Sequence, residues 1–314
     1  MCTCVALKLD RFYFGRNMDL EGSFDECVVM APRLFPFLLR NGRRVEEHYA
    51  ILGTAAVVNG YPLFADAMNE EGLCAAGLNF PGNAVYCESV AFGKEGIAPF
   101  ELIPYLLSTC ASVDEAEVAL RRIVLTDTPF SSELPLTPLH FMIADSKGAL
   151  TVEPMADGLH VYRNPVGVLA NNPPFSYHLA NLAQYANLSA DVPKASLYRS
   201  EGAVGLGMGG LGLPGDYSSA SRFVRAAFLK QTATCGQGRE EQVDCCFQIL
   251  SAVAPVKGCV TVDNGTPHYT TYSCCMSPDE KRYYLKRQGR LALFRAEMTA
   301  EGCMQKSLKF FEFF

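Results

Sequence analysis

MCTCVALKLDRFYFGRNMD, residues 1–19, is the stretch that decides the fold of this chain. Its apolar residues lie on both sides of Asp10-Arg11, and this pattern predicts two short strands joined by a tight turn. The second strand returns along the first and brings Arg16 and Asp19 back beside Cys2. The sequence therefore predicts a cysteine thiol flanked by one cation and one anion, of which the cation favours the thiolate.

Cys2 directly follows the initiator Met1. Methionine aminopeptidases remove Met1 when the second side chain is small, so we expect Cys2 to become the first residue. It then carries a thiol with an ordinary pKa of about 8.5, and an α-amine that titrates near about 7.7–8.0 and can hold or pass the thiol proton. A nucleophile and its base then lie in one residue. The alternative interpretation of Cys2 is a small apolar side chain without a catalytic role, at a frayed chain end.

The composition is that of a globular protein: the 314 residues are 49% hydrophobic and 19% charged, with a net charge of −6. This charge gives no electrostatic basis for a nucleic-acid partner. The length permits one large domain or two, and we expect a single domain over residues 1–314. The sequence has no amino-terminal signal pattern and no run of about 18 apolar residues. We therefore expect a cytoplasmic protein without a membrane partner.

Thirteen cysteines are many, but the number is odd and the chain is not a short, loop-rich disulfide scaffold. We therefore expect most of them to be buried, reduced thiols. The pairs Cys2/Cys4, Cys245/Cys246 and Cys274/Cys275 lack the CxxC spacing that brings two thiolates to one metal ion. The five histidines are scattered, and no glycine-rich phosphate loop stands out. We expect no metal and no organic cofactor; the alternative is a cysteine-based redox or metal-binding protein.

Period-two patterns and turn residues predict strands, and apolar faces at helical spacing predict helices. The predicted strands cover residues 3–9, 12–15, 27–31, 50–58, 63–68, 73–79, 139–144, 149–154, 158–163, 166–169, 268–276, 282–286 and 290–297. The predicted helices cover residues 99–110, 112–123, 175–188, 218–232 and 239–253, the second beginning at a capping box of Ser112 and Glu115. Hairpin connections between most strands favour antiparallel sheets with helices on the outer faces.

A glycine-rich segment, GAVGLGMGGLGLPG at 202–215, interrupts this order. It lacks the charged spacer residues of a linker, so we interpret it as an ordered loop or a subunit-contact arm. The chain on both sides of it then belongs to one domain.

Five segments together resemble the choloylglycine hydrolase family, which comprises bile salt hydrolases and penicillin V acylases within the N-terminal nucleophile hydrolases. The segments are MCT at 1–3, FGRNMD at 14–19, NEEGLCAAGLNFPG at 69–82, VLANNP at 168–173 and LPGDYSSASRFVRAAF at 213–228. The resemblance implies an α+β fold, the four-layer αββα sandwich of the family, and a homotetramer in which the glycine-rich segment makes subunit contacts. It also implies a cysteine amidohydrolase that acts on linear amides without a cofactor.

The resemblance assigns six residues to the active site: Cys2, Arg16, Asp19, Asn79, Asn171 and Arg222. In the implied reaction the Cys2 thiolate attacks an amide carbonyl, and donors from the Asn171 side chain and the Asn79 backbone stabilise the oxyanion. The terminal amine protonates the leaving amine, and water then cleaves the thioester. Taken singly, the two asparagines also suit turns at strand ends. Asp19 also suits a pair with Arg16, and Arg222 a solvated helix face.

Asn79 is typical of the bile salt branch, because penicillin V acylases tend to have tyrosine at the matching position. A steroid needs an apolar cleft, and the predicted substrate-binding residues are Met18, Leu20, Phe24, Asn79, Phe130, Leu134 and Leu136. We expect hydrolysis of glycine- or taurine-conjugated bile acids to free bile acid and amino acid. A penicillin V or N-acyl homoserine lactone acylase is the alternative in the same fold. Capture of the acyl-enzyme by an amine, and the preference between glycine and taurine, stay open.

Overall fold

The computed structural model describes residues 1–193 and 205–312, and two large β-sheets dominate it. The first sheet has six strands in the order β14-β1-β2-β15-β16-β17. Their bounds are Val168–Leu169 (β14), Cys2–Lys8 (β1), Phe12–Leu20 (β2), Tyr269–Ser277 (β15), Arg282–Arg287 (β16) and Phe294–Glu297 (β17). Neighbouring strands are antiparallel. Because β2 pairs with β15, strands from both ends of the sequence share this sheet.

The second sheet has eight antiparallel strands in the order β13-β12-β11-β8-β7-β6-β3-β18. Their bounds are Gly158–Arg163 (β13), Gly148–Met155 (β12), Leu139–Asp145 (β11), Cys74–Asn79 (β8), Tyr61–Asn69 (β7), Ile51–Val58 (β6), Cys27–Ala31 (β3) and Lys309–Phe311 (β18). Two small pairs complete the strands, β4 (Phe37–Leu38) with β5 (Arg44–Val45) and β9 (Glu95–Ile97) with β10 (Ile123–Leu125).

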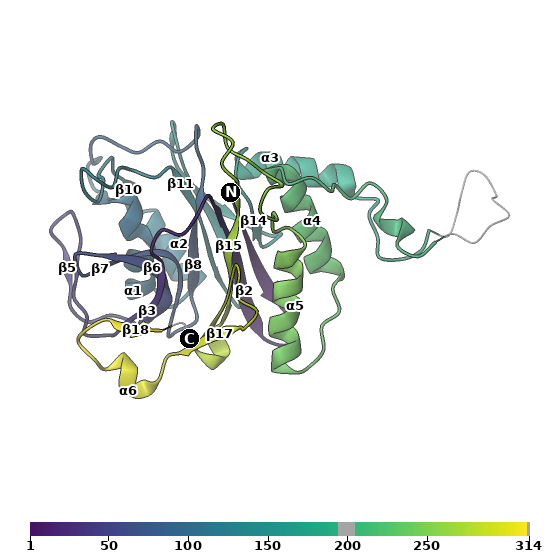
Figure 1. The fold of residues 1–314 in the computed structure, drawn as a ribbon. Coiled ribbons are helices and arrows are strands. Elements are labelled where there is room, and N and C mark those ends of the chain that lie inside the picture. The colour runs from purple at the N-terminus through teal and green to yellow at the C-terminus, as the bar shows by residue number, and fades with distance from the viewer. Residues whose placement is uncertain (194–204, 313–314) are drawn as a thin grey trace.

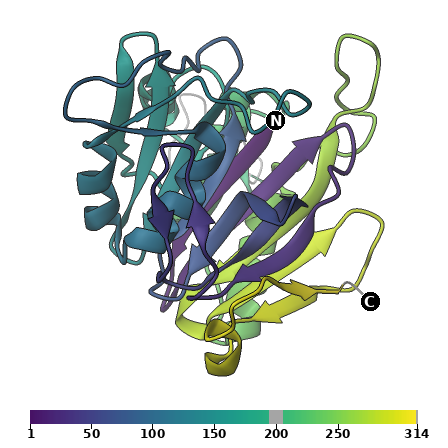
Figure 2. The same cartoon turned by 90° about the vertical axis from the view of Figure 1, so that its left-hand side faces the viewer.

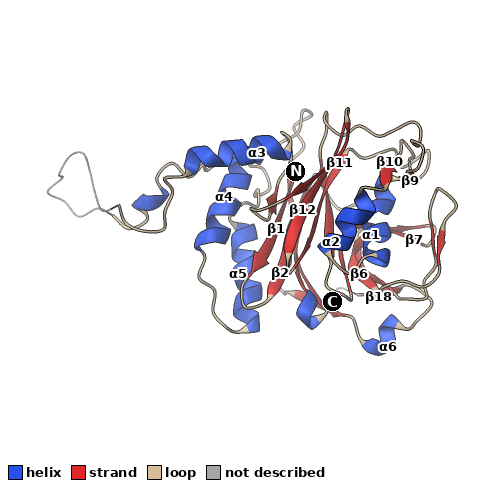
Figure 3. Ribbon diagram, turned by 180° about the vertical axis from the view of Figure 1, so that it is seen from behind, coloured by secondary structure: helices blue, strands red, loops and turns tan. Residues whose placement is uncertain are grey.

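Helices cover the outer face of each sheet (Figures 1 and 3). The 3₁₀ turn η1 (Pro99–Glu101) leads into α1 (Leu102–Thr109), which packs with α2 (Val113–Leu120) against the eight-stranded sheet. On the other side, α4 (Ser219–Thr232) and α5 (Arg239–Ser251) pack against the six-stranded sheet. The order of layers is therefore αββα, which confirms the predicted fold class.

The core of the protein is built from strands whose two faces are both buried. Successive side chains of a strand point to opposite faces, and nearly every residue of β1 and β2 is buried. One apolar cluster fills the space between the sheets and continues beneath α4 and α5. A second cluster lies between the eight-stranded sheet and helices α1 and α2. A polar side chain in the middle of this sandwich is cut off from water and needs a protein partner.

The opening hairpin forms as predicted, but its second strand is longer. β2 runs on through FGRNMD to Leu20, where the sequence predicted a strand only to Gly15. The pairing places Cys2 opposite Met18 and Cys4 opposite Arg16. Since residues of one parity share a face, these side chains all point toward the eight-stranded sheet. The predicted return of Arg16 to Cys2 is confirmed.

Two predicted helices end early. The helix predicted over 112–123 begins as expected, with the Ser112 side chain accepting a hydrogen bond from the Glu115 N–H, but it ends at Leu120. The residues that follow form β10, which pairs in parallel with β9. The helix predicted over 175–188 is α3 (Phe175–Leu182), followed by the 3₁₀ turn η2 (Ala183–Tyr185). Local helix propensity gives way to strand pairing in the first case.

The strands predicted over 166–169 and 290–297 begin later than expected, because a hydrogen-bonded turn precedes each of them. The side chain of Asn164 accepts hydrogen bonds from the N–H groups of Val166 and Gly167, so pairing begins only at β14. Residues 290–293 follow a turn in which the Arg290 N–H bonds to the Arg287 carbonyl, and only β17 pairs. A strand-like composition did not reveal either turn.

The sequence did not predict the closing elements. α6 (Ala300–Cys303) precedes β18, which pairs with β3 at the edge of the eight-stranded sheet. Strand β17 belongs to the other sheet, so the final segment crosses from one sheet to the other. The first strand β1 and the last strand β18 therefore lie in different sheets (Figure 2).

The segment after α3 extends away from the sandwich (Figure 1). Of the glycine-rich segment at 202–215, residues 202–204 lie outside the described residues, and the rest includes the 3₁₀ turn η3 (Met208–Gly210). The Ser189 N–H donates to the Gly209 carbonyl at 2.9 Å, which ties the two described parts of this extension together. The predicted ordered loop is thus partly seen, and its subunit contacts stay a prediction.

Gly53 lets β6 and β7 approach closely beside a bulge at Thr54 and Ala55. A Cβ there would lie 2.1 Å from the Asp66 carbonyl oxygen and 2.6 Å from the Ala67 Cα, and backbone atoms cannot move aside locally. We expect Gly53→Ala to lower the free energy of unfolding by about 1–3 kcal/mol or more, measured by urea denaturation. Gly22→Ala is the control, because a Cβ at Gly22 meets nothing within 4 Å. Equal stability of both variants would contradict the packing described.

Candidate active site

The structure brings together the six predicted active-site residues at one end of the sandwich. Cys2 begins β1, Arg16 and Asp19 lie on β2, and Asn79 ends β8. Asn171 follows β14, and Arg222 lies in the first turn of α4. Hydrogen bonds connect the group: Cys2 N–H to Asn171 Oδ1 (2.8 Å), Asn171 Nδ2 to the Asn79 carbonyl (2.7 Å) and Arg222 Nη2 to Asn171 Oδ1 (2.7 Å).

Arg16 is the cation beside the nucleophile. Its Nη2 lies 3.4 Å from Cys2 Sγ and 3.1 Å from Met18 Sδ. Burial raises the pKa of the Cys2 thiol, but the positive charges of Arg16 and the amino terminus outweigh it, and the net pKa lies below the usual value of a cysteine. The site therefore favours a thiolate at Cys2.

Asp19 does not pair with Arg16, which answers one alternative from the sequence. The carboxylate partner of Arg16 is Asp66, at 2.8 Å. Asp19 Oδ1 accepts a hydrogen bond from Thr270 Oγ1 at 2.6 Å, whereas its buried Oδ2 has no hydrogen-bond partner among the described residues. Burial raises the pKa of this carboxyl, and Arg222 opposes the rise. An unpartnered buried carboxylate oxygen next to the chain terminus suits a cationic donor.

The amino terminus lies at this site. With Met1 present, its ammonium is 3.0 Å from the Asp19 carbonyl and 2.5 Å from His268 Nε2, and the Asp19 N–H bonds to the Met1 carbonyl. Met1 thus extends the antiparallel pairing of β1 with β2. Removal of Met1 would transfer the positive charge to the Cys2 nitrogen, which donates to Asn171 Oδ1.

Asn171 is held from several sides. Its N–H donates to Ser219 Oγ at 2.8 Å, and its carbonyl lies 2.8 Å from His178 Nε2. The side-chain amide has two N–H groups, and in the described structure one of them reaches the Asn79 carbonyl. A fixed amide with a second N–H near Cys2 is suited to stabilise an oxyanion.

Arg222 is fully buried, so the alternative of a solvated helix residue is wrong. Its Nη1 donates to the Cys2 carbonyl at 2.5 Å and to Thr3 Oγ1 at 2.6 Å. Ser218 caps the amino terminus of α4 and fixes the turn from which Arg222 projects. Arg222 therefore orients Asn171 and the backbone of the nucleophile.

Sequence reasoning missed the residues that surround these six. Asp66 pairs with Arg16, Thr270 with Asp19, and His268 approaches the terminus. Asp66 lies within a run of small apolar residues, and a charged residue there was the only available signal. Arg16 is 50 residues from Asp66 in sequence, and Tyr272 and Tyr283 are 206 and 217 residues from it, so spacing could not reveal these contacts.

The predicted substrate-binding side chains fall into two groups. Met18 lies beside Cys2, with its Sδ 3.9 Å from Cys2 Sγ, while Leu20 and Phe24 are partly buried against the central core. Phe130 instead packs with Tyr61 and Phe100, at ring distances of 5.8 and 5.2 Å. Leu134 and Leu136 lie in the adjacent loop, and Leu134 is exposed. Only Met18 and Asn79 of this set make described contacts with the six residues.

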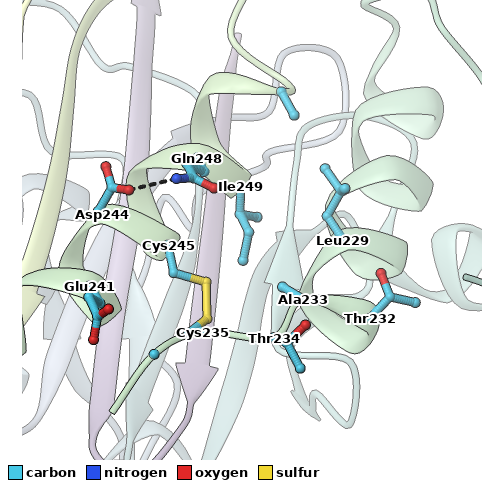
Figure 4. A pocket seen from close by; sticks show the side chains of 12 residues that line it. Leu229, Thr232, Ala233, Thr234, Cys235, Glu241, Asp244, Cys245, Gln248 and Ile249 are labelled. Atoms are coloured by element: carbon cyan, nitrogen blue, oxygen red, sulfur yellow. Dashed lines mark hydrogen bonds between the residues drawn. A yellow bond between two sulfur atoms is a disulfide. The ribbon is translucent and has the colours of Figure 1, made fainter. Parts of the chain in front are cut away.

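A pocket of about 530 Å³ lies between α4 and α5, away from these residues (Figure 4). It is lined in part by Leu229, Ile249 and a disulfide between Cys235 and Cys245. The remaining eleven cysteines are free, so most of the thirteen are reduced thiols as expected, and this disulfide was not predicted. None of the predicted site residues lines this pocket.

The described residues contain no group of three or more His, Cys, Asp or Glu side chains arranged to hold a metal ion. Within the same residues, no helix is long and apolar enough to cross a membrane.

The αββα sandwich and a cysteine at position 2 beside arginine, asparagine and aspartate define the class of the N-terminal nucleophile hydrolases. Residues 2–305 match the linear amide C–N hydrolases of the choloylglycine hydrolase family. The chain belongs to this family, as the resemblance predicted.

Known relatives support this assignment along nearly the whole chain. A bile salt hydrolase/transferase from Lactiplantibacillus plantarum is 45% identical over 288 residues, which are 91% of this chain and 89% of the relative. The solved structure of the C2A mutant of conjugated bile acid hydrolase from Clostridium perfringens has a TM-score of 0.90 at 35% identity, covering 100% of this chain and 97% of that one. Penicillin V acylase from Agrobacterium tumefaciens shares the fold, with a TM-score of 0.79 at 19% identity over 99% of this chain and 90% of its own.

Cys2 and Cys4 provide an internal comparison, because both are buried on the same face of β1. Burial raises the pKa of Cys4 well above the usual value, whereas the net pKa of Cys2 is lowered. We expect iodoacetamide to label Cys2 at neutral pH, below the ordinary pKa of a thiol, and to leave Cys4 unlabelled. Peptide mass spectrometry over a pH series measures both. Labelling of Cys2 only above the ordinary thiol pKa would contradict the site described.

Proposed function

We propose that this enzyme hydrolyses the amide bond of glycine- or taurine-conjugated bile acids and releases free bile acid and the amino acid. The observation that carries the proposal is the Cys2 thiol within 3.4 Å of Arg16 Nη2 at the start of β1. Asn171 bonds to the nitrogen of the same cysteine. The relatives that are named bile salt or conjugated bile acid hydrolases, and that align with nearly the whole chain, support the substrate class.

The geometry supports a two-step acyl transfer at Cys2. The thiolate forms a C–S bond to the amide carbonyl, and the second N–H of Asn171 and the backbone at Asn79 stabilise the oxyanion. The C–N bond then breaks as the terminal ammonium gives its proton to the leaving amine. In the second step water gives its proton to the terminal amine and its oxygen to the acyl carbon, and the thiolate leaves.

This mechanism requires removal of Met1, because the Cys2 nitrogen is otherwise an amide nitrogen, which is not basic enough to accept a proton at neutral pH. The buried Asp19 Oδ2 without a partner supports the requirement, since the freed ammonium of Cys2 would have an acceptor there. We further propose a single domain over residues 1–314, a homotetramer and a cytoplasmic location. The extended segment after α3 is available for subunit contacts (Figure 1).

Substrate preference tests the proposal directly. With purified protein we expect higher kcat/KM for glycocholate and taurocholate than for penicillin V or an N-acyl homoserine lactone. A folded Cys2→Ala variant should lose turnover of all of them, and intact-mass analysis should show that active enzyme lacks Met1. Higher kcat/KM for penicillin V or the lactone would favour the alternative acylase. Turnover at the parental rate by Cys2→Ala would refute the mechanism.

Replacement of Asn171 should lower kcat by more than a loss of stability alone would. We expect Asn171→Ala to lower kcat by about 10² to 10³, the loss typical of a missing oxyanion donor. Asn69→Ala is the control: Asn69 is equally buried, but its amide bonds to the carbonyls of Leu107 and Cys110. Its loss should lower the melting temperature and leave kcat of the folded protein unchanged. Similar kcat losses in both variants would argue against an oxyanion role.

A further inference from the structure

Asp66 lies on β7, and its carboxylate is fully buried between the two sheets. Its Oδ2 accepts hydrogen bonds from Arg16 Nη1 at 2.8 Å and from Tyr272 Oη at 2.6 Å. Its Oδ1 accepts from Tyr283 Oη at 2.5 Å and from Cys274 Sγ at 3.4 Å. All four donors project from the six-stranded sheet, whereas Asp66 belongs to the eight-stranded sheet. Both oxygens are therefore satisfied without water.

Arg16 connects this carboxylate to the nucleophile. Its Nη1 faces Asp66, and its Nη2 lies 3.4 Å from Cys2 Sγ. The carbonyls of Ala65 and Gly77, also in the eight-stranded sheet, accept from Nη1 and Nη2 at 2.9 and 2.8 Å. A guanidinium is planar and holds its donors in a fixed fork, so the contacts that fix Nη1 also fix the direction of Nη2.

We propose that Asp66 is the positioning residue of this active site: with Tyr272 and Tyr283 it holds Arg16 so that Nη2 faces Cys2, and its negative charge offsets the positive charge that the sulfur experiences. The proposal depends on the proposed function only in taking Cys2 as the nucleophile. The hydroxyl of Thr54 lies 2.6 Å from Tyr283 Oη and fixes that phenol in turn. The carboxylate is therefore anchored on both sides of the sheet interface.

The offset of charge has a chemical consequence. A thiolate that is stabilised more strongly is formed at lower pH but is a weaker nucleophile. With Asp66 present, Arg16 shares its charge between a carboxylate and the sulfur. Without that carboxylate, the whole charge of a buried guanidinium would act on Cys2, and the fork would lose its main anchor. We infer that Asp66 keeps Arg16 Nη2 directed at the Cys2 sulfur and keeps the thiolate reactive.

The test has to separate Asp66 from the other charged or titratable groups around the Cys2 thiol. These are Cys4 on β1, Arg16 and Asp19 on β2, Arg222 on α4, Tyr272 and Cys274 on β15, Tyr283 on β16, and His268 and the amino terminus at the chain end. Asp66→Asn leaves all of them in place and removes one negative charge at nearly constant volume. A change in the titration of Cys2 is then assigned to that charge.

The first experiment is the rate of Cys2 alkylation by iodoacetamide against pH, followed on the amino-terminal peptide by mass spectrometry. Removal of a nearby negative charge favours the thiolate, so we expect Asp66→Asn to lower the pKa of Cys2 by about one unit. The alkylation rate at high pH should fall, and kcat for conjugated bile acids should fall at least tenfold. Asp66→Glu keeps the charge and should leave the pKa of Cys2 within a few tenths of a unit of the parental value.

A second variant keeps the inference testable if Asp66→Asn does not fold. Tyr283→Phe removes one donor to Asp66 and preserves its charge, so we expect kcat to fall about three- to tenfold with KM unchanged, as befits a group that acts through Arg16. Tyr13→Phe is the matched control, because Tyr13 is equally buried but its hydroxyl donates to the side-chain oxygen of Gln242 on α5. It should lower the melting temperature and leave kcat unchanged.

Three results would overturn the inference. One is a folded Asp66→Asn protein in which Cys2 titrates as in the parent. Another is an equal shift in Asp66→Glu and Asp66→Asn, and the last is equal kcat for the two tyrosine variants. If the parental protein fails to hydrolyse conjugated bile acids, the proposed function is refuted. Alkylation of Cys2 needs no substrate, so the alkylation experiment would still decide the role of Asp66.

Discussion

The ion pair between Arg16 and Asp66 joins the two sheets of the sandwich at 2.8 Å, with both side chains shielded from water. Burying either charge alone would be strongly unfavourable, and the pair is tolerated because its members bond to each other and to further polar groups. The apolar packing of the sheets and the polarity of the active site therefore depend on the same contact. Arg16 approaches Cys2 only where the eight-stranded sheet supplies Asp66 and two carbonyl acceptors.

Around this pair, four stretches of the chain converge on Cys2. The hairpin provides Cys2, and β8 and the turn after β14 provide the two asparagines. Arg222 reaches them from α4 and bonds to both Asn171 and the Cys2 carbonyl. Asn171 and Arg222 are each held by several hydrogen bonds, which fixes their orientation around Cys2. Such preorganisation is what an acyl transfer needs, since little reorganisation then accompanies the charge that develops on the substrate oxygen.

Much of the fold could be predicted from local sequence. The strands at residues 27–31 and 158–163 have the predicted bounds. The helix over 112–123 was overextended, since Ile123 joins β9 in a pair that no local pattern reveals. The six proposed active-site residues were named from motifs, and the structure gathers them at one place. Asp66 and its tyrosine partners carry no motif and were missed.

The sequence by itself determined the cysteine at position 2, the hairpin that returns Arg16 to it, and the strand patterns that build two sheets, because these depend on residues a few positions apart. The tertiary structure decided which groups face one another across the sheets. It paired Arg16 with Asp66 rather than with Asp19, and it buried Arg222 against Asn171. The physical reason is that the partner of a buried charge is chosen by packing distance, and sequence separation gives no measure of that distance.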